Sequence, residues 1–303
     1  QLRSCTICNA PEDLLLDASI DAVLIACRSD MRSSYALQAL RAGKHALVEP
    51  PITADPLDLE RLASEAARAN LLLVPAHALR HDPAVTEAHN RTVLGEVGAV
   101  RELRCEWSCR QGWIQRRWQR QPWYSAIAHH AMQTLDLARL WLGEATAVSA
   151  DIDDLNVDPS DVGLANIIVQ HENGVSVHHI YKTSGTPRRE HYILTGSRGA
   201  LELSGPASGA LDRAATLRLT LHRSDGEAVA IDVSHDEVPR LRGHVSMPYR
   251  RMLEDFVRAL RDGTAPLVTV KDGIEATRLF RAAMTSSREG VKVQLTRSLD
   301  PDA

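Results

Sequence analysis

The first third of the chain alternates short apolar runs with amphipathic segments. Apolar runs occupy residues 21–26, 45–49 and 71–74. Short continuous runs of this kind are typical of strands buried on both faces of a parallel sheet. Residues 33–42 and 55–69 place leucine and alanine at helical spacing, so both segments are predicted to be helices. Strands and helices in alternation predict a doubly wound, Rossmann-like α/β sheet.

The pattern changes in the rest of the chain. Apolar and polar residues alternate strictly over residues 100–109, which predicts a strand with one face in solvent, as in antiparallel sheets. Helices are predicted over residues 126–142, 249–261 and 273–288, and further strands over 146–152, 163–171, 175–182, 191–195, 216–222 and 229–233. We therefore expect a partial Rossmann-like domain over residues 1–82. A large, mostly antiparallel open-sheet domain with helices on one face is expected over residues 83–303.

Composition and charge exclude two classes of partner. Hydrophobic residues make up 44% of the chain and charged residues 24%, with a formal net charge of −4 and no basic run. A nucleic-acid-binding surface needs clustered Lys and Arg, and a membrane span needs ~20 consecutive apolar residues; the sequence has neither. The five cysteines, an odd number spread over the chain, favour a reducing cytoplasm over a disulfide framework, and no metal site is predicted.

Several separated blocks resemble one known family. The blocks DAVLIAC…ALQALRAGKHALVEPP and LLLVPAHALRHDP, within residues 21–83, resemble the nucleotide-domain signature of the Gfo/Idh/MocA oxidoreductases. Residues 136–143 (DLARLWLG) resemble the helix that carries the family's HxxD motif, and residues 265–295 resemble its C-terminal helix and closing strand. The resemblance implies a Rossmann domain that binds NAD or NADP, then a substrate domain whose open sheet often pairs with another subunit. It also implies sugar, inositol or polyol substrates.

Four departures from the family pattern bear on redox chemistry. No glycine-rich turn precedes residue 21, so the part of a Rossmann fold that holds the pyrophosphate is missing. Ser29 and Arg32 stand where the resemblance implies an Asn and a His beside the cofactor. Pro50 replaces a Lys that the resemblance implies assists proton transfer, and Gln133 replaces the His of HxxD. A fragment that begins at Gln1 explains the first departure but not the other three.

These departures lead to three hypotheses about function. The first is a non-redox, cofactor-independent enzyme, a cyclase, isomerase or lyase that reuses the substrate cleft for a bulky apolar substrate in specialised-metabolite biosynthesis. The second is a divergent oxidoreductase of sugars or polyols that uses NAD or NADP and whose amino-terminal segment lies outside the sequence. The third is a non-catalytic binding or partner subunit. The first hypothesis, without a cofactor, is the one that the lost redox residues favour.

Candidate site residues come from two regions. The aromatic residues expected to line the cleft lie in a segment that holds all five tryptophans: Trp113, Trp118, Trp123 and Tyr124. The candidate catalytic residues are His129, His130, Gln133, Tyr181 and Lys182. Arg80 is a candidate for substrate binding or for bracing, and Asp136 for bracing. Of His178 and His179, alternation along a strand allows one to point inward.

An edge strand left open by a shortened parallel sheet must be covered. We therefore expect a homodimer, formed through that edge or through the open face of the second sheet.

Overall fold

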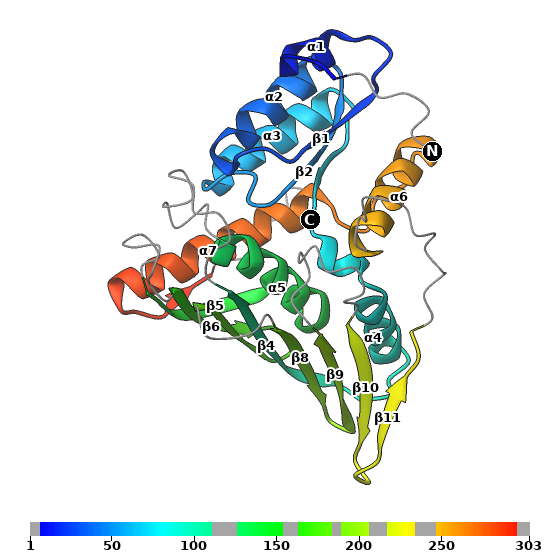
Figure 1. The fold of residues 1–303 in the computed structure, drawn as a ribbon. Helices are drawn as coiled ribbons and strands as arrows, with labels where there is room; N and C mark the ends of the chain where they lie inside the picture. Colours follow the sequence, from blue (N-terminus) through cyan, green and yellow to red (C-terminus); the bar gives the residue numbers. More distant parts are fainter. Residues whose placement is uncertain are drawn as a thin grey trace.

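The computed structural model describes residues 7–110, 126–153, 163–183, 189–205, 217–233 and 247–295. They form a small parallel sheet and a large mixed sheet, with helices between and around them (Figure 1). This is the Rossmann-like sheet domain followed by the large open-sheet domain that the hydrophobic pattern predicted.

The first sheet has three parallel strands in the order β1-β2-β3. Its elements are α1 (Pro11–Leu16), β1 (Ala22–Ile25), η1 (Ser29–Met31), α2 (Arg32–Arg41), β2 (His45–Val48), α3 (Pro56–Arg68) and β3 (Leu73–Pro75). Strand β2, in the centre, is nearly all buried, because helices α2 and α3 pack on one face of the sheet and other helices on the second. Asp55 caps α3 by accepting a hydrogen bond from Leu57 N at 3.1 Å.

The second sheet has nine strands in the order β11-β10-β9-β8-β4-β7-β6-β5-β12. They are β4 (Val100–Arg110), β5 (Ala145–Ile152), β6 (Gly163–His171), β7 (Val175–Thr183), β8 (Arg189–Gly196), β9 (Gly199–Gly205), β10 (Arg218–Arg223), β11 (Ala228–Ile231) and β12 (Val293–Gln294). Strands β4 and β7 are parallel, and the other neighbouring pairs are antiparallel. The prediction of a mostly antiparallel sheet is therefore confirmed.

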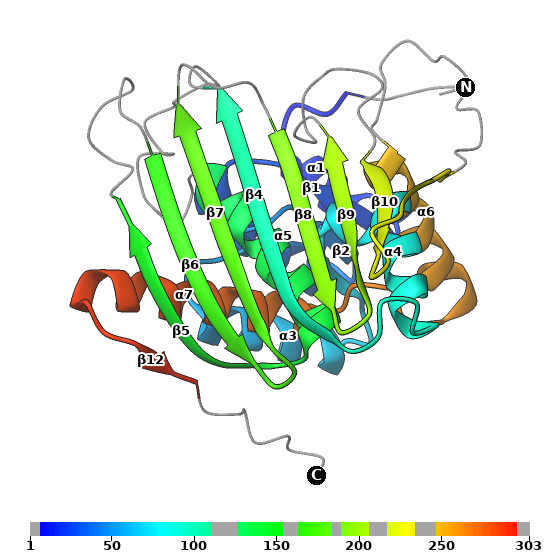
Figure 2. The same ribbon diagram turned by 90° about the horizontal axis from the view of Figure 1, so that it is seen from below.

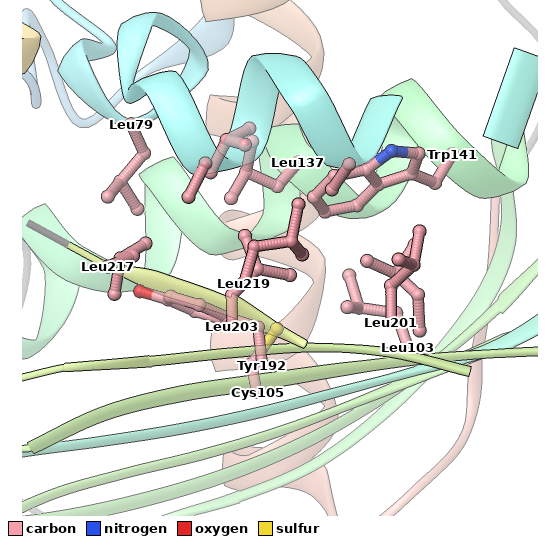
Figure 3. Packing of buried hydrophobic residues seen from close by; sticks show 14 of the residues in the cluster. Leu79, Leu103, Cys105, Leu137, Trp141, Tyr192, Leu201, Leu203, Leu217 and Leu219 are labelled. Carbon is pink, nitrogen blue, oxygen red and sulfur yellow. The ribbon is translucent and has the colours of Figure 1, made fainter. Parts of the chain in front are cut away.

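Helices cover one face of this sheet, and the described residues leave the other face open (Figure 2). The helices of this half are α4 (Pro83–Val93), α5 (Ala126–Leu142), α6 (Met247–Asp262) and α7 (Val270–Glu289), with the short η2 (Ala78–His81) before α4. Figure 3 shows Leu137 and Trp141 of α5 packed with the inward leucines of the strands. Alternation along each strand thus gives one apolar face under the helices and one polar face.

The two C-terminal helices join the two sheets. Met252 and Phe256 of α6 pack against Leu47 and Val74 of the first sheet, and Ile274 of α7 belongs to the core under α2 and α3. Helix α7 also lies along β5 of the second sheet. Helices α6 and α7 therefore help to bury the sheet formed by β1, β2 and β3.

Helices α1 and α4, the short η1 and η2, and strand β9 were absent from the predicted pattern. Helix α4 starts at Pro83 after Asp82, whose side chain accepts from Ala84 N at 2.8 Å; this Asp-Pro start was a usable signal. Strand β9 lies between two glycines. A Cβ at Gly199 would lie 2.5 Å from His222 O, so the strand approaches β10 more closely there than a side chain allows.

Candidate functional site

The parallel strands of the first sheet point their carboxyl ends at the first turns of α5. In open α/β sheets ligands bind outside these ends, where the loops diverge. Here the loop after β2 carries Glu49, Pro50 and Pro51, with a cis peptide bond between the two prolines. The residues gathered around it, which we call the junction site, are Arg32, Glu49, Pro50, His129, Gln133 and Tyr249.

Arg32, the first residue of α2, ties the loop after β1 to the loop after β2. Its Nη1 donates to Pro50 O at 2.6 Å and to Pro51 O at 3.3 Å, and its Nε donates to Cys27 O at 3.1 Å. Burial lowers the pKa of Arg32, and the nearby Glu49 carboxylate opposes that shift. Because an arginine pKa starts above 12, the guanidinium stays charged at neutral pH.

His129 and Gln133 form a second tie to the same loop. Leu79 N donates to Gln133 Oε1 at 3.2 Å, which orients the amide so that its Nε2 faces His129 Nε2 at 3.0 Å. His129 Nδ1 lies 2.7 Å from Pro50 O. A carbonyl oxygen only accepts and an amide nitrogen only donates, so the proton of His129 is on Nδ1 and the lone pair on Nε2. Burial lowers the pKa of His129, and both ring nitrogens are engaged in its neutral form.

His130, the next residue, faces the second sheet instead. Its ring stacks on Trp107 with centroids 4.2 Å apart, and its Nε2 lies 3.4 Å from the Tyr192 hydroxyl. Burial, followed by His129, lowers the pKa of His130 well below its usual value. With His130 only 4% exposed, the structure places it as a neutral ring in the core below the junction site.

A buried ion-pair network next to the junction site links η2, α5 and α7. Arg80 makes a bidentate pair with Asp136 at 2.7 and 2.6 Å and also reaches Asp272 at 3.1 Å, which Arg139 contacts at 3.2 Å. His77 Nδ1 lies 3.2 Å from Asp136. Burial opposes the charge on Asp136, but His77 and Arg80 outweigh it and hold the pKa of Asp136 below its usual value. Arg80 is thus placed in the bracing position, linking η2 to α5 and α7.

Tyr249 and Glu49, which are far apart in the sequence, are the remaining residues of the junction site. Tyr249, near the start of α6, packs on the cluster that contains Leu47 and Val74, and it lies close enough to Glu49 for the carboxylate charge to act on its hydroxyl. Burial, and then the Glu49 carboxylate, raise the pKa of Tyr249 above its ordinary value. The phenol therefore stays protonated near neutral pH. Glu190, fully buried at the start of β8, lies near enough to add to this shift.

The structure does not bring Tyr181 together with the junction site. Its neighbour Ile180 packs under α5, so strand alternation places Tyr181 on the open face, where its hydroxyl donates to Glu106 at 3.2 Å. His178 is fully buried and His179 lies on the open face. Lys182 pairs with Gly163 in the sheet, but its side chain lies outside the described residues. The predicted cleft residues Trp113, Trp118, Trp123 and Tyr124 also lie outside them.

The sequence analysis did not predict that Glu49 and Tyr249 lie close together. Two hundred residues separate them, and no spacing rule connects positions that far apart. Within the described ranges, no group of three or more His, Cys, Asp or Glu is placed to hold a metal ion. None of the helices in the same part of the chain is long and apolar enough to cross a membrane.

The strand ends of the Rossmann-like sheet meet the helical face of the open-sheet domain. This arrangement is typical of a class of two-domain oxidoreductases. Residues 4–77 match the oxidoreductase family's NAD-binding Rossmann fold, and residues 90–295 match its C-terminal alpha/beta domain. The chain therefore belongs to the Gfo/Idh/MocA oxidoreductase family, as its sequence blocks indicated.

Relatives across the family cover nearly all of the chain. It is 26% identical over 289 residues to D-xylose 1-dehydrogenase (NADP(+)) 2 of Haloferax volcanii, a match that covers 94% of this chain and 83% of the relative. It is 27% identical over 302 residues to scyllo-inositol 2-dehydrogenase (NAD(+)) of Bacillus subtilis, with 94% and 80% covered. The crystal structure of aldose-aldose oxidoreductase from Caulobacter crescentus, complexed with glycerol, shares the fold at 19% identity and a TM-score of 0.76, covering 94% and 82%.

These matches correct two predictions. The leading hypothesis of a cofactor-independent cyclase, isomerase or lyase is wrong, because relatives along the whole chain are dehydrogenases named for NAD or NADP. The expectation of no cofactor is wrong for the same reason, and because the matched first block is an NAD-binding fold. The error came from reading the replaced Lys and His as loss of the reaction. A proton acceptor lost at one position can be supplied by another side chain nearby.

Proposed function

We propose that this chain is an NAD- or NADP-dependent oxidoreductase that acts on a hydroxyl group of a sugar or polyol. The observation that carries the proposal is the junction site itself, where strand ends of the nucleotide-binding half meet polar side chains of α5 and α6. The dehydrogenase relatives, matched over 94% of the chain, support the same reaction class. The cofactor, when bound, supplies the hydride acceptor or donor.

The residues at the strand ends suit such a cofactor. Helix α2 begins there with no acidic residue in its first turn, and Arg32 adds a positive charge. A positive charge at a helix start attracts anions such as the diphosphate of a nicotinamide cofactor. The residues that would hold the nicotinamide end are Arg32 and the loops that contain Ser29 and Pro50. Arg32 and His129 keep these loops in place by binding their carbonyl groups, and Gln133 holds His129.

Calorimetric titration of the purified chain with NADH and with NADPH tests the proposal. Binding of either nucleotide tighter than ~100 μM, about −5.5 kcal/mol, is the expected result. Oxidation of D-xylose, D-apiose, scyllo-inositol and myo-inositol is then followed through NADH or NADPH absorbance. If neither nucleotide releases or absorbs heat at concentrations where the intact mass and fold are verified, the proposal fails.

We also propose a homodimer that forms through the open face of the second sheet, in the cytoplasm. Ile168, on the open face of β6, is 48% exposed, and Leu164 of the same strand, Val177 of β7 and Ile193 of β8 lie on the same face. An exposed apolar patch of this kind favours association. Light scattering at micromolar concentration is expected to give twice the chain mass, and Ile168→Asp to give a monomer. A monomeric mass for the unaltered chain would refute this assignment.

A further inference from the structure

Four side chains between α5 and the second sheet form one continuous line of hydrogen bonds. They come from the β6–β7 hairpin and from α5, and we call them the polar row: His171, Ser176, His178 and Thr134. His171 Nε2 lies 2.9 Å from Ser176 Oγ, which lies 2.8 Å from His178 Nε2. His178 Nδ1 in turn lies 3.0 Å from Thr134 Oγ1. The other end of the row meets the backbone just after α5, where His171 Nδ1 lies 2.9 Å from Gly143 O.

The polar row is almost completely removed from solvent. Ser176, His178 and Thr134 are 0% exposed, and His171 is 6% exposed. Burial lowers the pKa of His178 to about 3 and also lowers the pKa of His171, so both rings are neutral near pH 7. A neutral imidazole carries one proton, so each ring has one donor nitrogen and one acceptor nitrogen.

The carbonyl at one end sets the direction of each hydrogen bond in the polar row. Gly143 O can only accept, so the proton of His171 is on Nδ1 and its Nε2 is the acceptor. Ser176 therefore donates its proton to His171, and its oxygen accepts from His178 Nε2. His178 Nδ1 is then the acceptor for the hydroxyl of Thr134.

Thr134 has a single proton and two acceptors within reach. Ala131 O lies 3.2 Å away, but this carbonyl also accepts a backbone N–H within α5. His178 Nδ1 lies 3.0 Å away and has no other donor in the row. Leaving a buried acceptor unpaired costs more than a second bond to a carbonyl gains, so the proton of Thr134 goes to His178.

We infer that the polar row runs in one direction, from the Thr134 hydroxyl to the Gly143 carbonyl, and that Thr134 and His178 are positioning residues for the junction site. The row ties α5 to the β6–β7 hairpin at two points, in the middle of the helix and just after its last residue. Gly143 follows Thr134 by nine residues, ~13 Å along the helix, so the two ties oppose both sliding and rotation. The effect on turnover rests on the proposed oxidoreductase function, whereas the proton positions do not.

The direction of Thr134 is coupled to the direction of its neighbour Gln133. Successive residues of a helix point about 100° apart, so turning Gln133 away from His129 also takes Thr134 off the sheet. The other contacts of α5 with the sheet are mostly apolar, and apolar burial fixes rotation poorly because it has no direction. The ion-pair network holds α5 from η2, and the polar row holds it from the sheet.

Nitrogen NMR of the unaltered chain tests the proton positions directly. Protonated and unprotonated ring nitrogens differ widely in chemical shift, so the tautomer of each neutral histidine is measurable at pH 7. We expect the proton of His171 on Nδ1 and the proton of His178 on Nε2. The variants His171→Gln and His178→Gln identify the signals, with His179→Gln on the open face as control. The opposite tautomer at either ring, or a charged ring at pH 7, would overturn the direction of the row.

Thr134→Val tests the positioning role, with Thr134→Ser as the conservative variant. Valine resembles threonine in shape but has no hydroxyl, so it removes the bond to His178. The ring N–H of His129, held to Pro50 O, should exchange faster with water in Thr134→Val and as slowly as in the unaltered chain in Thr134→Ser. For the best polyol, kcat should fall ~10–100-fold in Thr134→Val, because a small misplacement of site residues has effects of this size. Thr134→Ser should keep kcat within about threefold, and both variants should keep the calorimetric Kd of NADH or NADPH within about threefold.

The outcomes separate this inference from the proposed function. If Thr134→Val lowers Tm but leaves the His129 ring proton and kcat unchanged, the row only stabilises the fold and the positioning role is refuted. Equal losses in Thr134→Ser and Thr134→Val would show that the hydroxyl is not responsible, which also refutes it. If no nicotinamide nucleotide binds, the proposed function fails, while the tautomers and the His129 ring proton still decide for or against the polar row.

Discussion

Replacing Asp136 with asparagine removes the charge at the centre of the buried network. Asp136 is 0% exposed, and Arg80, 8% exposed, holds both of its oxygens at 2.7 and 2.6 Å. Breaking a buried ion pair on one side costs about 3–5 kcal/mol, because the remaining charge is left in a poor environment. Asp272 still lies 3.1 Å from Arg80, so we expect the lower end, ~3 kcal/mol.

The corresponding change in melting temperature follows from the chain length. At ~2.1 cal/mol/K per residue, a 303-residue chain has an unfolding entropy of ~0.6 kcal/mol/K, so ~3 kcal/mol lowers Tm by about 5 °C. Circular dichroism on heating measures this, with Glu289→Gln as control. Glu289 pairs with Arg288 at side-chain exposures of 52% and 73%, so its loss should shift stability by less than ~0.5 kcal/mol.

The effect of Asp136→Asn also has a definite pH dependence. The pKa of Asp136 is lowered in the folded chain, so the unfolded chain binds its proton more readily, and the carboxylate stabilises the fold fully above the unfolded pKa of about 4. As pH falls through the folded pKa, this contribution is lost. The difference in Tm between the unaltered chain and Asp136→Asn should therefore be largest at pH 7 and smaller at pH 3. A Tm for Asp136→Asn within 1 °C of the unaltered chain at pH 7 would refute the bracing role.

Three further perturbations have expected outcomes. Gln133→Ala leaves Leu79 N–H and His129 Nε2 without partners, so chemical denaturation should show a loss of stability of ~1–3 kcal/mol. The pKa of His129 should rise, which histidine NMR measures. An unchanged titration of the His129 resonance would contradict the contact between Gln133 and His129. Gly273→Ala puts a Cβ 2.5 Å from Pro75 Cγ, and this overpacking should lower stability by ~1–3 kcal/mol although alanine favours a helix more than glycine does. A gain in Tm would contradict this contact. Burial lowers the pKa of His81 to about 4, so as pH falls the unfolded chain binds a proton at this residue before the folded chain does. The free energy of unfolding should therefore decrease between about pH 6.5 and pH 4. The decrease should be smaller in His81→Gln.

The functional prediction from sequence failed for an identifiable reason. The replaced motif residues Arg32, Pro50 and Gln133 were interpreted together as a loss of redox chemistry. In the structure Arg32 and Gln133 hold the loop that contains Pro50, one directly and one through His129. Substitutions that remove ionisable groups can thus leave the loops of a site held in place.

Patterns among neighbouring residues predicted most of the local elements and the family. Short apolar runs predicted the parallel strands, strict alternation predicted β4, and the order of the family-like blocks predicted the fold, because each of these is a property of neighbouring residues. Which side chains meet depends on tertiary packing. Glu49 and Tyr249 come together through the packing of α6 on the first sheet, and the proton position on His129 depends on contacts with Pro50 and Gln133. Such contacts join elements far apart in the chain, and hydrophobic periodicity carries no information about their pairing.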